Sequence, residues 1–159
     1  MKMNSLVDRE CIAALYRASQ AGVTVELNVR GICCLRPGVP GVSDHIRVVS
    51  VVGRFLEHSR IYAFERDGEQ TVYIGSADLM PRNLDTRVEL LAPVRDDALR
   101  AELLDALERC MADDTNAWTL DPDGCWTRRT PSPLEPRSAQ RELMERHAAR
   151  AAEAAAGAA

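Results

Sequence analysis

Hydrophobic positions change between helical and strand spacing along the chain, which predicts an α/β domain. Over residues 8–21 the apolar side chains recur every three or four positions, as in an amphipathic helix that starts at an Asp8 cap and ends before Gly22. Residues 23–29 then alternate apolar and polar side chains, the pattern of a half-buried strand. A helix, a glycine and a strand in this order are typical of a parallel α/β unit.

The same patterns predict the remaining elements. Strands are expected over residues 46–52, 61–64, 70–75 and 87–93, with a turn at Asp67-Gly68 between the second and the third. A helix over 96–111 is capped by Asp96 or Asp97, and a hairpin joins residues 115–120 to 125–128 through the turn at 121–124. Residues 30–44 and 76–86 are expected to be irregular loops. One face of the second helix is predicted to lie in the core: Leu99, Leu103, Leu104 and Leu107.

The C-terminal part of the chain has a different composition. Residues 130–137 are rich in proline and predict a linker, whereas 138–159 are rich in alanine and charge and predict a helical or disordered tail. The expected division is therefore a domain over 1–129, a linker over 130–137 and a tail over 138–159.

Length and composition restrict the class of protein. A chain of 159 residues with 46% hydrophobic and 28% charged residues is typical of one globular domain. We find no run of eighteen apolar residues and no signal peptide, so we expect a cytoplasmic protein without a transmembrane segment. The five cysteines are an odd number and lack zinc-site spacing, so neither disulfides nor cysteine-bound metal are expected.

The charge is unevenly distributed. The net charge of −4 argues against a general nucleic-acid-binding protein. Residues 28–62 nevertheless carry a local excess of three positive charges, from Arg30, Arg36, Arg47, Arg54 and Arg60. This cluster predicts a focused anion site. The alternative is a solvated loop whose arginines pair with acidic residues elsewhere.

A histidine motif suggests phosphoryl chemistry. His58-Ser59-Arg60 leads into a predicted strand, and the segment GSAD follows at residues 75–78. The arrangement is similar to a phospholipase D-type half-site, HxKxxxxD followed by GSxN, with Arg60 in the Lys position and Glu65 in the Asp position. A histidine at a strand end can act as a nucleophile or a general acid toward a phosphoryl oxygen, and a nearby cation stabilises the transferred group. The alternative is a structural histidine.

Several longer motifs occur in one order: KMNSLVD at 2–8, VRGIC at 29–33, LRPG at 35–38, FLEHSR at 55–60 and YIGSADLMPRNLD at 73–85. Together they resemble the C-terminal part of the long bacterial polyphosphate kinases, over roughly residues 2–129. One departure is Leu79, where the family usually has Trp after Ser-Ala-Asp.

The resemblance implies a fold and a site. The fold is an α/β, phospholipase D-like mixed sheet flanked by helices, incomplete at its N-terminal edge. It corresponds to the second of two such domains, and the histidine that ATP phosphorylates lies in the first, outside this sequence. Arg30 and His58 match the residues that meet the nucleotide phosphates, and His58 is the expected catalytic residue. Arg60 and Arg82 are further phosphate-binding candidates, and metal ligands are not expected in this chain.

The function implied is that of a C-terminal catalytic-domain fragment of polyphosphate kinase, whose family reaction extends polyphosphate by one phosphate from ATP. ATP or ADP and polyphosphate are the expected ligands, and Mg²⁺ is the cofactor implied by the family. Self-association, or docking to the missing domains, is expected of a domain cut inside its sheet. Membrane association would come through the complete enzyme. The alternative is a non-catalytic anion-binding or assembly module.

Overall fold

The computed structural model describes residues 1–157 and contains one mixed sheet with helices on both faces. The eight strands have the spatial order β6-β5-β4-β1-β2-β3-β7-β8. Their bounds are β1 Lys2–Met3, β2 Val25–Val29, β3 Ile46–Val51, β4 Arg60–Arg66, β5 Glu69–Gly75, β6 Leu91–Val94, β7 Ala117–Leu120 and β8 Trp126–Arg128. The predicted α/β class is confirmed, including the parallel pairing of β1 with β2 and of β2 with β3.

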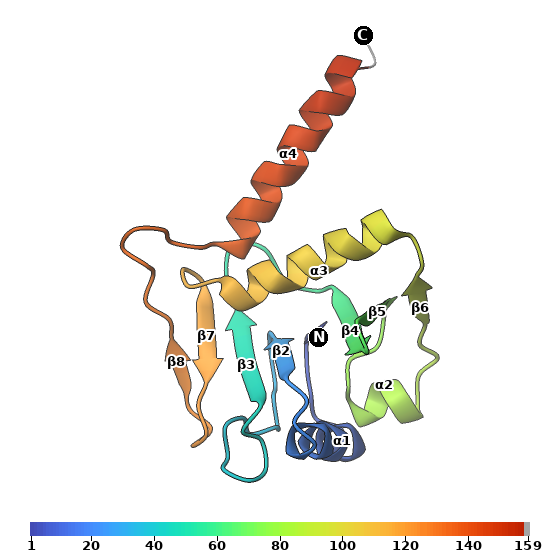
Figure 1. Cartoon of the computed structure of the whole chain (residues 1–159), viewed down its shortest axis with the longest axis vertical. Coiled ribbons are helices and arrows are strands. Elements are labelled where there is room, and N and C mark those ends of the chain that lie inside the picture. Colours follow the sequence, from blue (N-terminus) through green and yellow to red (C-terminus); the bar gives the residue numbers. More distant parts are fainter. Residues whose placement is uncertain (158–159) are drawn as a thin grey trace.

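The helices form layers above and below the sheet in Figure 1. They are α1 Arg9–Gln20, α2 Pro81–Asp85, α3 Asp97–Ala112 and α4 Ala139–Gly157. α3 crosses one face, whereas α1 lies against the other, and α4 extends away from the sheet on the side of α3. Within residues 1–157, no helix combines the length and the apolar character that crossing a bilayer requires.

Local signals in the sequence account for several element boundaries. The Asp8 carboxylate accepts the backbone N–H of Cys11 at 2.9 Å, and Asp96 caps α3 in the same way through Leu99. Asp67 and Gly68 have φ angles of +53° and +81°, both in the left-handed region that a tight hairpin turn requires. The β4–β5 hairpin predicted from this dipeptide is therefore confirmed.

Two separate apolar clusters hold the layers together. The larger one lies on the α1 face and includes Leu15, Leu27 and Val48, all buried. The smaller one lies on the α3 face and joins Val49, Cys110 and Ala139 with their neighbours. Because successive residues of a strand face opposite sides, Val48 and Val49 of β3 contribute to different clusters.

Three sequence predictions need correction. The loop expected over 76–86 contains the short helix α2, which begins at a proline that suits a first helical turn. The strand expected from residue 87 begins only at Leu91. The leucine stripe of α3 is not fully in the core: Leu99 is 57% exposed, and Leu103, Leu104 and Leu107 are only half-buried.

The reason for the half-buried leucines lies in the centre of the sheet. β1 has two residues, whereas its neighbours β2 and β4 have five and seven. The shortest strand therefore lies in the middle of the sheet, between β2 and β4, and not at an outer edge. The apolar face of α3 has less sheet to pack against at this point.

The C-terminal segment runs from residue 130 into α4. The Asp114 carboxylate accepts the backbone N–H groups of Ser132 and Arg137, which holds both ends of the segment 132–137 on the domain. α4 is helical to Gly157, and residues 158–159 of the expected tail lie outside the described part. The division into 1–129, 130–137 and 138–159 remains a prediction.

Candidate functional site

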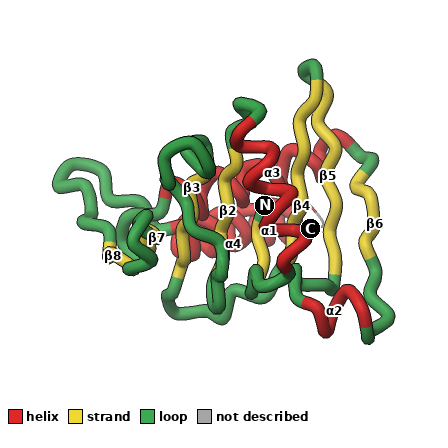
Figure 2. The backbone as a smooth tube through the Cα atoms, turned by 90° about the horizontal axis from the view of Figure 1, so that it is seen from below, coloured by secondary structure: helices red, strands yellow, loops and turns green. Residues whose placement is uncertain are grey.

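Four chain segments bring polar side chains to one edge of the sheet. Asn4 follows β1 and Arg30 follows β2, so the ends of two parallel strands place them together. β4 is antiparallel to β1, so its first residue Arg60 and the preceding His58 lie at the same edge. β5 is antiparallel to β4, and its end leads to Asp78. In Figure 2 this edge carries α2 and the connecting loops, opposite the projecting β4–β5 hairpin.

These side chains form one continuous chain of hydrogen bonds. Arg30 Nε donates to Asn4 Oδ1 at 3.2 Å. The backbone N–H of Asn4 donates to Asp78 Oδ1 at 2.7 Å, and its side-chain amide donates to Oδ2 at 3.3 Å. Arg60 binds the same carboxylate through Nε at 3.2 Å and Nη2 at 2.9 Å. Arg30 and His58 thus belong to one network although 28 residues separate them.

Asp78 is the centre of this network. Its side chain is 4% exposed and that of Arg60 is 13% exposed, so both charges are largely removed from water. Burial by itself raises the pKa of Asp78, but donation from Arg60 and from Asn4 outweighs it and holds the pKa below its usual value. A carboxylate with four donors is ionised at neutral pH and fixes the geometry of its partners.

The network orients Arg30 but uses only one of its nitrogen donors. Only its Nε is bonded, and its two Nη groups have no protein partner within residues 1–157. Its backbone carbonyl accepts the Ser50 hydroxyl at 3.2 Å. The next residue, Gly31, leaves little room for a side chain, because a Cβ there would lie 3.0 Å from the Asn4 carbonyl oxygen. The two Nη groups are therefore parallel hydrogen-bond donors on a side chain whose position is fixed by Asn4 and by its own backbone.

His58 is exposed and is held from two sides. Arg60 Nη1 lies 3.2 Å from His58 Nδ1 and donates to the His58 carbonyl oxygen at 3.0 Å. The residues on either side of His58 are bonded to Lys2, whose ammonium lies 2.9 Å from Glu57 and 2.8 Å from the Ser59 hydroxyl. The imidazole is thereby presented to solvent on an anchored loop.

Three positioning residues were not predicted from the sequence. Asn4 joins Arg30 to Asp78, and Lys2 fixes the loop on both sides of His58. Gln140, at the start of α4, accepts from the backbone N–H of Phe55 at 2.9 Å and donates to Phe55 and Glu57. Lys2 is the only lysine of the chain and stands between two methionines, which could have indicated a buried structural ion pair.

The basic cluster of the sequence is dispersed in space. Arg47 lies at the other end of the sheet beside Glu26, and Arg36 contacts the β7–β8 turn. Arg54 is stacked on the ring of Phe55 at 5.4 Å. The structure brings together Arg30 and Arg60, so the predicted focused site contains two of the five arginines.

Arg82 is not part of the network either. It is exposed on α2, and its side chain has no hydrogen-bond or ion-pair partner among residues 1–157. Its neighbour Asn83 is buried and donates to Glu89 at 2.6 Å, and Ser76 also donates to Glu89. The serine of the GSAD segment therefore holds the loop to the residues just before β6. Its hydroxyl also accepts the N–H of Leu90.

The phospholipase D-type pattern holds only in part. Glu65, in the Asp position of that pattern, lies five residues along β4 from Arg60, or about 17 Å at the rise of a strand. Its side chain accepts a hydrogen bond from Gln70 on the neighbouring strand. The pattern thus identified His58 and Arg60 at the site, whereas the carboxylate beside them is Asp78.

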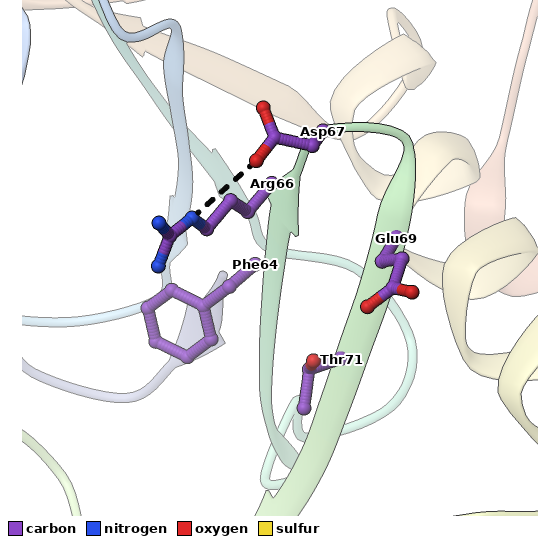
Figure 3. Close-up of a pocket in the computed structure, with 5 residues that line it drawn as sticks. All are labelled: Phe64, Arg66, Asp67, Glu69 and Thr71. Atoms are coloured by element: carbon purple, nitrogen blue, oxygen red, sulfur yellow. Dashed lines mark ion pairs between the residues drawn. The ribbon is translucent and has the colours of Figure 1, made fainter.

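A hollow lies at the far end of the β4–β5 hairpin. Figure 3 shows its lining residues, with the exposed ion pair between Arg66 and Asp67 at 3.6 Å and the ring of Phe64 on the same strand. It has a volume of about 470 Å³ and none of the predicted site residues lines it. We therefore place the candidate site at the opposite edge of the sheet.

Comparison with known proteins gives the family. The family described as "Polyphosphate kinase C-terminal domain 2" matches residues 1–140. The chain belongs to this family. A polyphosphate kinase of Streptomyces coelicolor is 60% identical over 128 residues, which are 80% of this chain and 17% of that protein. One of Pseudomonas aeruginosa is 52% identical over 149 residues, 93% of this chain and 22% of that protein.

A solved structure shares the fold. The crystal structure of the polyphosphate kinase from Porphyromonas gingivalis matches with a TM-score of 0.89 and 43% identity, covering 94% of this chain and 23% of that one. The agreement is consistent with the phospholipase D-like fold. The chain spans about a fifth of the length of these polyphosphate kinases.

Proposed function

We propose that this chain is the part of a polyphosphate kinase that binds the phosphates of ATP or ADP and of polyphosphate. The family reaction extends polyphosphate by one phosphate from ATP and is reversible. The observation that supports the proposal best is the hydrogen-bonded network that places Arg30 and His58 at one sheet edge. Open α/β sheets bind ligands at such strand ends.

Arg30 is the proposed phosphate ligand. Its two unbonded Nη groups can donate in parallel to two oxygens of one phosphate, while Nε stays on Asn4. Because Asn4 already holds the Arg30 side chain, binding a phosphate costs less conformational entropy than it would for a mobile arginine.

His58 is the proposed catalytic residue, and Arg60 positions it. Two nitrogens of Arg60 are bonded to Asp78 and the third to the carbonyl of His58, so Arg60 presents the imidazole and adds positive charge near it. In the transferring state His58 would donate a hydrogen bond or a proton to a phosphoryl oxygen, where charge develops. The histidine that carries the phosphoryl group belongs to another domain of the kinase.

Arg82, which is exposed on α2, is a further proposed phosphate ligand.

Mg²⁺, implied by the family, finds no fitting set of ligands here: residues 1–157 hold no group of three His, Cys, Asp or Glu side chains suited to a metal, and Asp78 is engaged by Arg60 and Asn4. We therefore assign no step of the chain's chemistry to magnesium. Action in the cytoplasm, with membrane association through the complete enzyme, belongs to the same proposal.

The alternative function is an anion-binding or assembly module that is inactive without the domain bearing the phosphorylated histidine. Both readings predict that the isolated chain makes no polyphosphate from ATP. Steady synthesis accompanied by phosphohistidine on this chain would refute both. Binding and turnover must therefore be measured separately.

The test is a titration of the chain with polyphosphate at low and high salt. Arg30→Ala should weaken binding by about tenfold or more, because a charge-assisted pair of hydrogen bonds is lost. Arg36→Ala, a change in the same basic segment but outside the network, should have little effect. His58→Ala should leave binding nearly unchanged in the isolated chain.

The role of His58 is tested in a complete polyphosphate kinase. The equivalent His→Ala change should lower kcat with little change in KM, as expected for a group used mainly in the transition state. An unaffected kcat would remove His58 from the chemistry. Equal loss of binding for the Arg30 and His58 variants would instead contradict the separation of their roles.

A further inference from the structure

The segment that carries His58 has few backbone contacts. It connects β3 to β4 over residues 52–59 and contains neither helix nor strand. Phe55 and Leu56 are exposed there, and His58 lies near the end of the segment. Among residues 1–157, the backbone of 53–57 is hydrogen-bonded to one side chain only, that of Gln140. The path of the chain toward His58 therefore depends on Gln140.

Gln140 holds this segment through both ends of its side-chain amide. Its Oε1 accepts the backbone N–H of Phe55 at 2.9 Å, and its Nε2 donates to the carbonyl of the same residue at 2.8 Å. Nε2 also donates to Glu57 Oε1 at 2.7 Å. The side chain thus pairs with Phe55 as a residue of a neighbouring strand would, and it also fixes the residue just before His58.

The segment is shaped for this close contact at Gly53. A Cβ there would lie 2.5 Å from Gln140 Oε1 and 3.0 Å from its Cδ, so a methyl group would displace the amide. Gly53 does not have a positive φ, so the backbone geometry does not require a glycine at this position. What requires it is the approach of the Gln140 amide to the backbone of the segment.

The start of α4 keeps Gln140 itself in place. The backbone N–H of Ala139 donates to Asp113 Oδ2 at 2.7 Å in a buried contact. Glu142, in the first turn of α4, accepts from Arg109 of α3 at 2.6 Å. Gln140 is only 7% exposed. Since a long side chain loses conformational entropy when it is ordered, this anchoring reduces the cost that its three hydrogen bonds must offset.

We propose that Gln140 is a positioning residue for phosphoryl transfer, because it fixes the segment in front of His58. Ser59, on the other side of His58, is already held by Lys2. With both contacts present, the backbone on either side of the imidazole is fixed. Loss of the Gln140 contact would displace the imidazole, and a displacement of about 1 Å can cost a hundredfold in rate. This inference rests on the proposed role of His58.

The experiment uses a complete polyphosphate kinase that shares these residues with this chain, and the changes are numbered as here. Gln140→Met keeps the length of the side chain and removes its hydrogen bonds. It should lower kcat by about tenfold and change KM by less than about twofold, because the displaced group is used mainly in the transition state. Arg141→Ala, the matched control, breaks only an exposed pair with Glu145 and should leave both constants unchanged.

Gly53→Ala tests the same contact without altering Gln140 or His58. The added methyl group displaces the amide, so kcat should fall by a similar factor. In this chain the imidazole NMR signals of His58 should shift in both variants, whereas those of His45, at the opposite end of β3, should not. Circular dichroism verifies the fold, and Gly53→Ala replaces Gln140→Met in every comparison if the latter is unfolded.

A double variant separates this inference from the proposed function. Since Gln140 acts through His58, the kinase with both His58→Ala and Gln140→Met should be no slower than with His58→Ala alone. An unchanged kcat for His58→Ala refutes the proposed function and this inference with it. A lowered kcat for His58→Ala with an unchanged kcat for Gln140→Met overturns this inference alone. Losses that multiply in the double variant, or unshifted His58 signals, overturn it as well.

Discussion

The site edge and the centre of the sheet differ in how completely their side chains are enclosed by partners. At the site edge Asp78 accepts four hydrogen bonds, and the residues around it are fixed by partners from distant parts of the chain. In the centre of the sheet β1 has only two residues, and the side chains of Leu104 and Leu107 on α3 are only half-buried. The comparison teaches that contacts between distant segments can fix a polar site firmly while an apolar helix face of the same domain stays partly open.

The largest expected effect is at the site edge. Asp78→Ala leaves Arg60 buried without its counter-charge and should lower the free energy of unfolding by about 3–5 kcal/mol. Arg66→Ala, which breaks the exposed pair with Asp67, should change it by less than about 0.5 kcal/mol. Urea unfolding followed by circular dichroism measures both, and equal effects would remove the contrast between buried and exposed pairs.

Leucine truncations compare the closed core with the open one. Leu27→Ala, at a fully buried position of β2, should cost about 2–5 kcal/mol. Leu107→Ala, at a half-buried position of α3, should cost about 1 kcal/mol, because less apolar surface is removed from water there. Urea unfolding of both variants measures the difference. Equal costs would show that Leu107 is as fully buried in solution as Leu27.

A smaller effect is expected at the contact between α4 and the loop before His58. Gln140→Ala removes three hydrogen bonds to Phe55 and Glu57 and should cost about 1–2 kcal/mol. Amides of residues 55–59 should exchange faster. Gln70→Ala, which removes one exposed side-chain hydrogen bond, is the control and should leave both quantities nearly unchanged. Unaltered exchange in the Gln140 variant would show that α4 does not hold this loop.

The smallest expected effect is the dependence of stability on pH. The pKa of Asp78 is lower in the folded than in the unfolded chain, so its stabilisation is present above the unfolded value of about 4 and is lost as pH falls through the folded value. Urea unfolding from pH 7 to pH 3 should therefore show a steeper loss for the natural chain than for Asp78→Asn. Parallel curves would mean that Asp78 is not stabilised as an anion.

The roles predicted for Arg30 and His58 stay predictions, but their expected position at strand ends is confirmed. The residues that connect them were missed, because Asn4 reaches Asp78 across 74 positions and Gln140 reaches Phe55 across 85. The single anion site predicted from the basic segment was too broad for the same reason. Arginines that are close in sequence, such as Arg30 and Arg47, lie at opposite ends of the strands.

The sequence by itself determined the local structure of this protein and its family. Helix caps at Asp8 and Asp96 and the turn at Asp67-Gly68 depend on residues a few positions apart, so their signals can be read without the fold. Only the tertiary structure decided which polar groups meet and which apolar faces stay open. The leucines of α3 have the pattern of a core helix, and their burial depends on the strand order, which places the short β1 opposite them. Burial is a property of what lies across the interface, and that is fixed by contacts between distant segments.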